Sequence, residues 1–157
     1  MTSTAYQYEN VTSNGAETVF REVNIKYSRK RKAPSMKSPS DVARWLRAIM
    51  PNNSQEHLVA LYLDGAHQPI GFSVVSTGLQ TSCPVHPREV YQRAIALGAY
   101  SLIMAHNHPS GDPSPSKEDD QVTKQLADAG KVLGIKMLDH IIISDEAHYS
   151  YQSQGKM

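Results

Sequence analysis

Cysteine is almost absent from this chain, which has a single cysteine, Cys83, among 157 residues. One thiol excludes an internal disulfide and a structural zinc site built from cysteines, and it suits a reducing cytoplasm. His86 follows three residues later, but catalytic Cys–His pairs are assembled in space and not by local spacing. We therefore do not expect Cys83 to be a nucleophile.

The chain also lacks a large excess of charge and long apolar runs. Its formal net charge is +1, so no overall electrostatic field draws it onto nucleic acid. No apolar region opens the sequence, and no apolar run approaches membrane-spanning length. These absences predict a soluble, cytoplasmic protein with no membrane partner, and its length suffices for one domain with a sizeable core.

The sequence divides into three segments. Residues 1–17 are polar and aperiodic, and we expect them to be flexible. Residues 18–35 contain an alternating pattern typical of a strand, followed by a basic linker that includes the charge run at 29–32. Residues 36–157 form the main domain.

The main domain alternates between helical and strand patterns. Ser38 and Pro39 mark a helix start, and Gly98 fits the end of a second helix. A turn at Asp64-Gly65 separates two strands that we expect to be antiparallel. The expected helices begin at Ser38, cover 87–97, and run from 117 to about 129 with Gly130 at the end; the expected strands cover about 57–63, 70–76, 100–105, 136–143 and 147–151. This order predicts an α+β fold with a mixed sheet flanked by helices.

The pattern richest in chemistry is His106-Asn107-His108, followed by Ser116 and Asp119. Residues two apart on a strand point to the same face, so both histidine rings can converge while Asn107 points away. Ser116 fits a helix N-cap, which puts Asp119 in the first helical turn. Two imidazoles and one carboxylate leave a fourth zinc position free for water, as in catalytic zinc sites. The spacing predicts a zinc site with His106, His108 and Asp119 as metal ligands, and it indicates hydrolysis.

Simpler interpretations exist for the same residues. Ser116 and Asp119 also match a capping box, and the two histidines can be ordinary residues at a strand end. Asp112 and Asp120 compete with Asp119 as the carboxylate ligand and are disfavoured only by their spacing. Imidazole and carboxylate also suit iron, manganese and nickel, so the pattern favours zinc without excluding those metals.

A further histidine lies inside the apolar strand expected at 136–143. His140 follows Asp139 there, and a histidine in such a strand is most often a core residue that is hydrogen-bonded to a neighbour. This is our first expectation. The alternative is that His140 orients one of the zinc ligands.

Several stretches together resemble the RadC family, bacterial members of the JAB/MPN group, whose metal motif is called JAMM. They are the segment from His106 through Asp119, residues 85–89 before a helix, residues 76–78 after a strand, and residues 138–143. The similarity covers residues 36–151. It implies the MPN fold, with its cytidine-deaminase-like architecture, and a JAMM-type zinc metalloprotease-like domain.

The resemblance also implies roles for individual residues. The family pattern includes a glutamate at the start of an early strand, and Glu56 fits this position as the general acid/base. Ser116 helps to stabilise the tetrahedral intermediate, and the three zinc ligands remain those named above. Glu89 is the rival acid/base, but it opens a helix, where acidic residues are favoured in any case.

Members of the family usually carry a helix-hairpin-helix-like region before this domain. We expect no such region here, because the residues before position 36 are too few for it, and we therefore expect a short, stand-alone form. A DNA-binding role that depends on that region is not expected here.

Three functions remain open at this point. The leading one is a zinc-dependent hydrolase of the metallopeptidase or isopeptidase kind, acting on an unknown peptide or isopeptide-linked protein. The second is a DNA-associated accessory protein, of repair or antirestriction type, suggested by the basic residues at 29–32, although no aromatic stacking platform accompanies them. The third is a noncatalytic, metal-bearing interaction module, against which the complete set of Glu56, Ser116 and the metal ligands argues.

Overall fold

A computed structural model describes residues 36, 38–49, 55–78 and 85–157. The expectations for residues 1–17 and 18–35, which include the basic run at 29–32, lie outside the described residues. Cys83 lies outside them as well.

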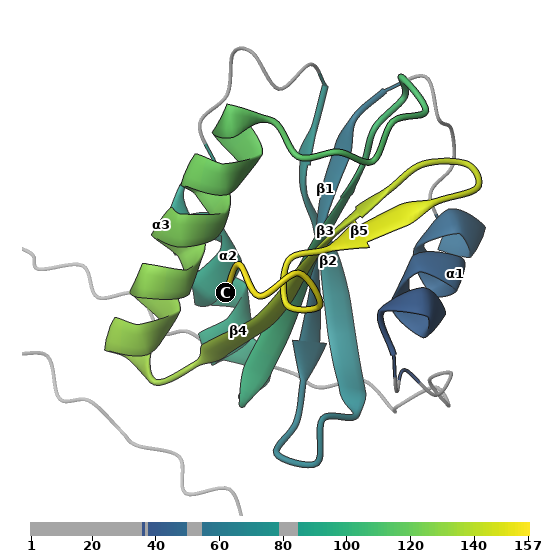
Figure 1. The fold of residues 1–157 in the computed structure, drawn as a ribbon. Helices are drawn as coiled ribbons and strands as arrows, with labels where there is room; N and C mark the ends of the chain where they lie inside the picture. Colours follow the sequence, from purple (N-terminus) through teal and green to yellow (C-terminus); the bar gives the residue numbers. More distant parts are fainter. Residues whose placement is uncertain (1–35, 37, 50–54, 79–84) are drawn as a thin grey trace, which may run out of the picture.

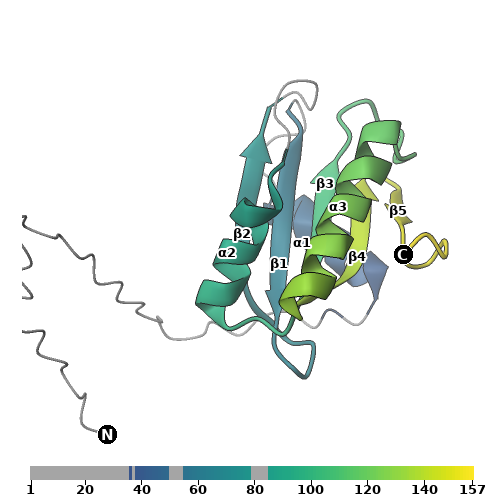
Figure 2. The same cartoon turned by 90° about the vertical axis from the view of Figure 1, so that its left-hand side faces the viewer.

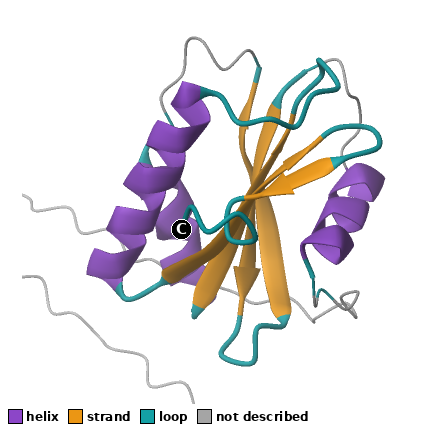
Figure 3. Ribbon diagram, viewed as in Figure 1, coloured by secondary structure: helices purple, strands orange, loops and turns teal. Residues whose placement is uncertain are grey.

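The described residues form a mixed five-stranded sheet with helices on both faces (Figures 1 and 3). The elements are α1 (Pro39–Ile49), β1 (His57–Leu63), β2 (Pro69–Thr77), α2 (Pro87–Leu97), β3 (Ser101–Asn107), α3 (Lys117–Leu133), β4 (Lys136–Ile143) and β5 (His148–Ser150). The strand order is β2-β1-β3-β4-β5, and only the β3–β4 pair is parallel. The sequence-based expectation of an α+β fold with a mixed sheet is confirmed.

Two apolar clusters join the helices to the sheet. Helix α1 covers one face, while α2 and α3 cover the other (Figures 1 and 2). All seven residues of the interior strand β1 are buried. Ala60 and Tyr62 pack with α2 and α3, whereas Val59 and Leu61 pack with α1. Alternate residues of a strand point to opposite faces, so β1 contributes to both clusters. None of the helices in the described ranges is both long and apolar enough to cross a membrane.

Local start and stop signals locate several elements as the sequence predicts. The backbone N–H of Asp41 donates to Ser38 Oγ at 3.2 Å, and Pro39 is the first residue of α1. Gly98 ends α2 with φ of 63°, a left-handed conformation that glycine adopts without steric cost. The expected antiparallel pair at 57–63 and 70–76 is present as β1 and β2.

The expected end of the third helix at Gly130 is wrong. Helix α3 continues to Leu133 and ends at Gly134, which has φ of 69°. Gly130 lies inside the helix, where a Cβ atom would clash with the Tyr91 hydroxyl and the Ile135 carbonyl. Close packing therefore explains this glycine, and a helix end does not.

Candidate metal centre

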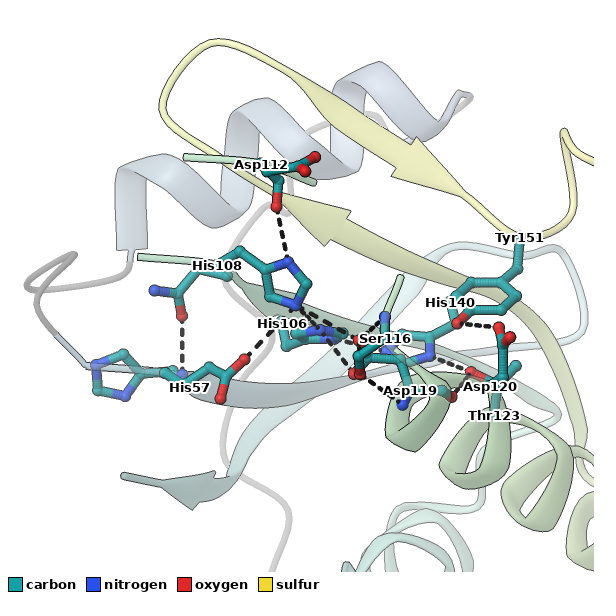
Figure 4. Close-up of polar contacts among 12 residues, drawn as sticks. His57, His106, His108, Asp112, Ser116, Asp119, Asp120, Thr123, His140 and Tyr151 are labelled. Atoms are coloured by element: carbon teal, nitrogen blue, oxygen red, sulfur yellow. Dashed lines mark hydrogen bonds and ion pairs between the residues drawn. The ribbon is translucent and has the colours of Figure 1, made fainter. Parts of the chain in front are cut away.

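Three segments that are distant in the sequence meet at one end of the sheet (Figure 4). His106 lies near the end of β3, and His108 directly follows that strand. Strand β1 pairs Leu58 with His106, which brings the start of β1, and with it Glu56, toward His108. Asp119 lies in the first turn of α3, next to both histidine rings. The sheet pairing and the return of the chain into α3 therefore bring all four side chains together.

Several pairs of polar atoms in this cluster lie between 3.0 and 3.6 Å apart. The Nε2 atoms of His106 and His108 are 3.0 Å apart. Asp119 has one carboxylate oxygen 3.1 Å from His106 Nε2 and the other 3.5 Å from His108 Nε2, and Glu56 Oε1 lies 3.6 Å from His108 Nε2. Ligand atoms of a tetrahedral zinc site are about 3.3 Å apart, because each lies about 2.0–2.1 Å from the metal. The separations bracket this value. Glu56, His106 and His108 form a group that could hold a metal ion, and the Asp119 carboxylate lies beside both histidine rings.

The hydrogen bonds of His108 determine which of its ring nitrogens faces the cluster as an acceptor. Nδ1 lies 2.8 Å from the carbonyl oxygen of Asp112. A carbonyl oxygen only accepts hydrogen bonds, so Nδ1 carries the proton. In the neutral ring, Nε2 then presents a lone pair to the cluster.

A chain of hydrogen bonds fixes His106 in the same way (Figure 4). Thr123 Oγ1 donates to the carbonyl oxygen of Asp119 at 2.6 Å, so it accepts from His140 Nδ1, which is 2.6 Å away. His140 Nε2 must then accept, and its partner is His106 Nδ1 at 2.9 Å. Because His140 is fully buried, its pKa lies well below the usual range and the ring is neutral. His106 therefore also directs an Nε2 lone pair at the cluster.

With both rings neutral, two lone pairs and one carboxylate thus face one another. Such a group needs a cation between its members, either a proton or a metal ion. When a proton takes this place, the histidines donate to Asp119: burial alone would raise the pKa of Asp119, but these hydrogen bonds hold it far below its ordinary value. The hydrogen bond to Asp119 in turn raises the pKa of His108. Neutral imidazoles and an ionised carboxylate are the forms that bind metals, so the donor set fits a divalent ion.

The two carboxylates of the cluster have different surroundings. Asp119 is 2% exposed, and its Oδ2 accepts hydrogen bonds from the Ser116 backbone N–H at 2.8 Å and from Ser116 Oγ at 2.6 Å. Glu56 is only partly buried and lies just before the first residue of β1. A fixed, buried carboxylate suits a permanent ligand, whereas a more accessible one suits proton transfer. The two carboxylates thus differ in burial and in the number of hydrogen bonds that fix them.

Ser116 and Asp119 form the capping box that the sequence also allowed. The Asp119 backbone N–H donates to Ser116 Oγ at 3.1 Å, and the Asp119 side chain accepts from the Ser116 backbone N–H. The same carboxylate contacts His106 through its other oxygen. One residue thus starts the helix and faces the candidate metal position, so the two interpretations are compatible.

The competing carboxylates have other positions. Asp112 is exposed, and its Oδ1 accepts from the Ser114 backbone N–H. Asp120 accepts a 2.8 Å hydrogen bond from the Tyr151 hydroxyl. Glu89 is exposed on the first turn of α2, and among the described residues the potential metal-binding group contains Glu56 in its place.

The structure confirms the first interpretation of His140. It is a buried, hydrogen-bonded histidine as expected, but its partner is His106, which corresponds to the alternative interpretation. The Tyr151 ring stacks on one face of the His140 imidazole at a centroid distance of 5.3 Å and restricts its rotation (Figure 4). The sequence contained a signal for a polar partner of His140. Thr123 follows Asp119 by four residues and so lies on the same helix face, next to the candidate site.

Comparison with known proteins identifies the family of the chain. A family model described as RadC-like JAB domain matches residues 36–156. A UPF0758 protein of Bacillus cereus strain AH187 is 44% identical over 135 residues, which are 86% of this chain and 59% of that protein. A UPF0758 protein of Geobacillus sp. strain WCH70 is 46% identical over 120 residues, which are 76% of this chain and 53% of the relative.

The third relative considered is a UPF0758 protein of Bacillus anthracis strain CDC 684, which is 43% identical over 135 residues. The aligned parts cover 53% to 59% of the length of these three relatives. The chain therefore spans less than two thirds of the proteins that it matches, and the family match includes every residue of the candidate centre.

Proposed function

Because the chain belongs to the RadC family of JAB domains, we propose that it is a zinc-dependent hydrolase that cleaves an amide bond in a peptide or in an isopeptide-linked protein. The observation that carries the proposal is the convergence of two imidazole lone pairs on the buried Asp119 carboxylate. Nitrogen and carboxylate ligands at tetrahedral spacing are typical of catalytic zinc sites with three protein ligands.

His106, His108 and Asp119 would hold the metal. When bound, zinc supplies a coordinated water with a pKa of about 7 and polarises the substrate carbonyl. The hydrogen bonds of His106 to His140 and of His108 to the Asp112 carbonyl keep both rings in the ligating tautomer. The protein thus prepares its ligands before the metal arrives.

Glu56 would act as the general acid/base that transfers the proton of the attacking water. Its carboxylate lies at the edge of the ligand cluster, 3.6 Å from His108 Nε2, and is partly accessible to solvent. A carboxylate in this position can take a proton from the attacking water and later pass it to the leaving amine. This transfer makes cleavage of an amide possible near neutral pH, since an unprotonated amine is a poor leaving group.

Ser116 would act on the substrate through its hydroxyl. A donor directed at the oxyanion that develops on the scissile carbonyl stabilises the transition state. Ser116 Oγ donates to Asp119 Oδ2 at 2.6 Å in this structure. Its proton must therefore turn from the ligand to the substrate during the reaction.

A peptide screen tests the proposed activity directly. Zinc-loaded protein is incubated with a library of short linear peptides and a library of lysine-branched isopeptides, and the products are identified by mass spectrometry. We expect cleavage in at least one library, its loss when a chelator removes the metal, and its return when zinc is restored. Absence of cleavage by protein that demonstrably holds zinc would favour the noncatalytic metal-bearing module.

The hydrogen-bond chain from Thr123 to His106 yields a second expectation. Thr123→Val removes the hydroxyl while keeping the branched shape, so His140 loses the partner that sets its tautomer. We expect the zinc affinity to fall by up to about 10-fold. This is the lower end of the loss that follows removal of a direct partner of a ligating histidine, because Thr123 acts on His106 through His140. Competition with a chromophoric chelator measures the change.

Thr123→Ser is the matched control because it retains the hydroxyl and loses only a methyl group. Its zinc affinity should stay within about threefold of the original. Equal losses in the serine and valine variants would show that packing, and not the hydroxyl, supports the site.

A further inference from the structure

The middle residue of the histidine motif makes contacts that the proposed chemistry has not used. Asn107 is 3% exposed, and its side chain lies between β3 and the segment that enters β1. Its Oδ1 accepts a hydrogen bond from the His57 backbone N–H at 2.8 Å, and its Nδ2 donates to the Gln55 carbonyl oxygen at 2.9 Å. These two hydrogen bonds, which we call the Asn107 bridge, reach the residues immediately before and after Glu56.

The bridge replaces backbone pairing where the sheet opens. The β1–β3 ladder ends at the pair Leu58–His106, so the next antiparallel position would pair His57 with Asn107. The Asn107 backbone still pairs with Ile143 of β4 on its other side, and toward β1 its side chain makes the contacts. A carboxamide has the same donor and acceptor as a peptide group, so this side chain can continue the ladder toward β1.

The other side of the same segment is held as well. The Gly78 backbone N–H donates to the Glu56 carbonyl oxygen at 3.0 Å. The backbone around Glu56 therefore has hydrogen bonds on both sides, to β3 through Asn107 and to the end of β2 through Gly78. Its side chain projects from this fixed backbone to 3.6 Å from His108 Nε2.

We propose that Asn107 is the positioning residue of Glu56, so that one three-residue stretch sets both the metal ligands and the carboxylate beside them. His106 and His108 lie on one face of the strand end and would supply ligands. Asn107, between them, points the other way and binds the backbone on both sides of Glu56. The inference rests on the proposed function, since the position of Glu56 matters to catalysis only if Glu56 transfers a proton. Asn107 itself does not touch the substrate.

The test compares Asn107→Ala in two backgrounds, using the best-cleaved peptide of the screen and zinc-loaded protein. In the original background we expect kcat to fall by about 10- to 50-fold, with KM and zinc content changed less than about threefold. In a Glu56→Asp background the shorter carboxylate is already displaced. There, Asn107→Ala should lower kcat by less than about threefold, because residues that act through one another are not additive.

Thr77→Val is the matched control. It removes the 3.1 Å contact between Thr77 Oγ1 and His57 Nδ1 at the same strand end but leaves the Asn107 bridge intact, so kcat should be unchanged. An equal fall of kcat for Asn107→Ala in both backgrounds would reveal a general structural role and overturn the proposal, as would no fall in either. If Glu56→Gln leaves cleavage unaffected, the proposed function itself is wrong.

A measurement without substrate distinguishes failure of the Asn107 proposal from failure of the proposed hydrolase function. Amide hydrogen exchange at His57 reports the bond to Asn107 Oδ1, and we expect it to be at least about tenfold faster in Asn107→Ala and unchanged in Thr77→Val. Unchanged exchange in Asn107→Ala would mean that the bridge does not hold the backbone beside Glu56, and the inference would fail whatever the protein hydrolyses.

Discussion

Protein purified without a metal-affinity tag is expected to contain about one zinc ion per chain, and the His106→Ala/His108→Ala variant is expected to contain none. The two Nε2 atoms lie 3.0 Å apart and both face Asp119, so removing the rings leaves only the carboxylates of Asp119 and Glu56. Without the two imidazoles, we expect these carboxylates to be too weak a site to retain zinc through purification. Elemental analysis by mass spectrometry gives the metal content and also identifies iron, manganese or nickel.

The matched control is His86→Ala/His148→Ala, which removes the same number of imidazoles from exposed positions. Its zinc content should equal that of the unaltered protein. Both variants are compared after their folds have been verified by circular dichroism, since His106 is fully buried. If the unaltered folded protein binds no metal after zinc has been supplied, the cluster is held together by a proton, and the metal hypothesis is wrong.

Elements with strong local signals could be predicted from the sequence. Ser38 and Pro39 define a helix start, and Gly98 defines a helix end, through interactions among neighbouring residues. The proximity of His106, His108 and Asp119 could be predicted for the same reason, because the two histidines are two residues apart and Asp119 follows its helix N-cap, Ser116, by three residues. Only the return of α3 onto the strand end had to be assumed.

Interactions set by long-range pairing could not be predicted. The contact between His140 and His106 depends on the parallel register of β3 and β4, in which Met104 lies opposite His140. Hydrophobic periodicity gives no parallel register, since any shift by two residues preserves the same buried face. Asn107 was expected only to point away from the metal, and its hydrogen bonds follow from where the β1–β3 ladder ends.

Glycine gave a misleading local signal in α3. A glycine that follows an amphipathic stretch usually ends a helix, and Gly130 and Gly134 both fit that position. The choice between them is made by Tyr91 of α2, whose hydroxyl donates to the Leu126 carbonyl oxygen at 2.8 Å and leaves no room for a Cβ atom at residue 130. Close packing between two helices therefore requires a glycine at position 130, but the sequence does not show which residue packs against it.

Glu56→Gln is expected to lower kcat for the best-cleaved peptide by about 10²- to 10⁴-fold, the usual contribution of general acid/base catalysis. Glutamine has nearly the same shape and still accepts hydrogen bonds, but it cannot take a proton from water. The zinc content should remain that of the unaltered protein, because Glu56 lies outside the three proposed ligands. Steady-state kinetics and elemental analysis on the same preparation measure both quantities.

The two measurements together decide between the roles that the geometry allows for Glu56. Its carboxylate is close enough to the histidines to be counted with them as a possible ligand. A loss of zinc in Glu56→Gln would therefore identify it as a ligand, and unchanged kcat with full zinc content would exclude it from proton transfer. Glu89→Gln is the matched control, since this exposed glutamate opens α2. Its kcat should change by less than about twofold, the range of ordinary surface substitutions. A large fall in kcat for Glu89→Gln, with none for Glu56→Gln, would reverse the assignment that the cluster supports.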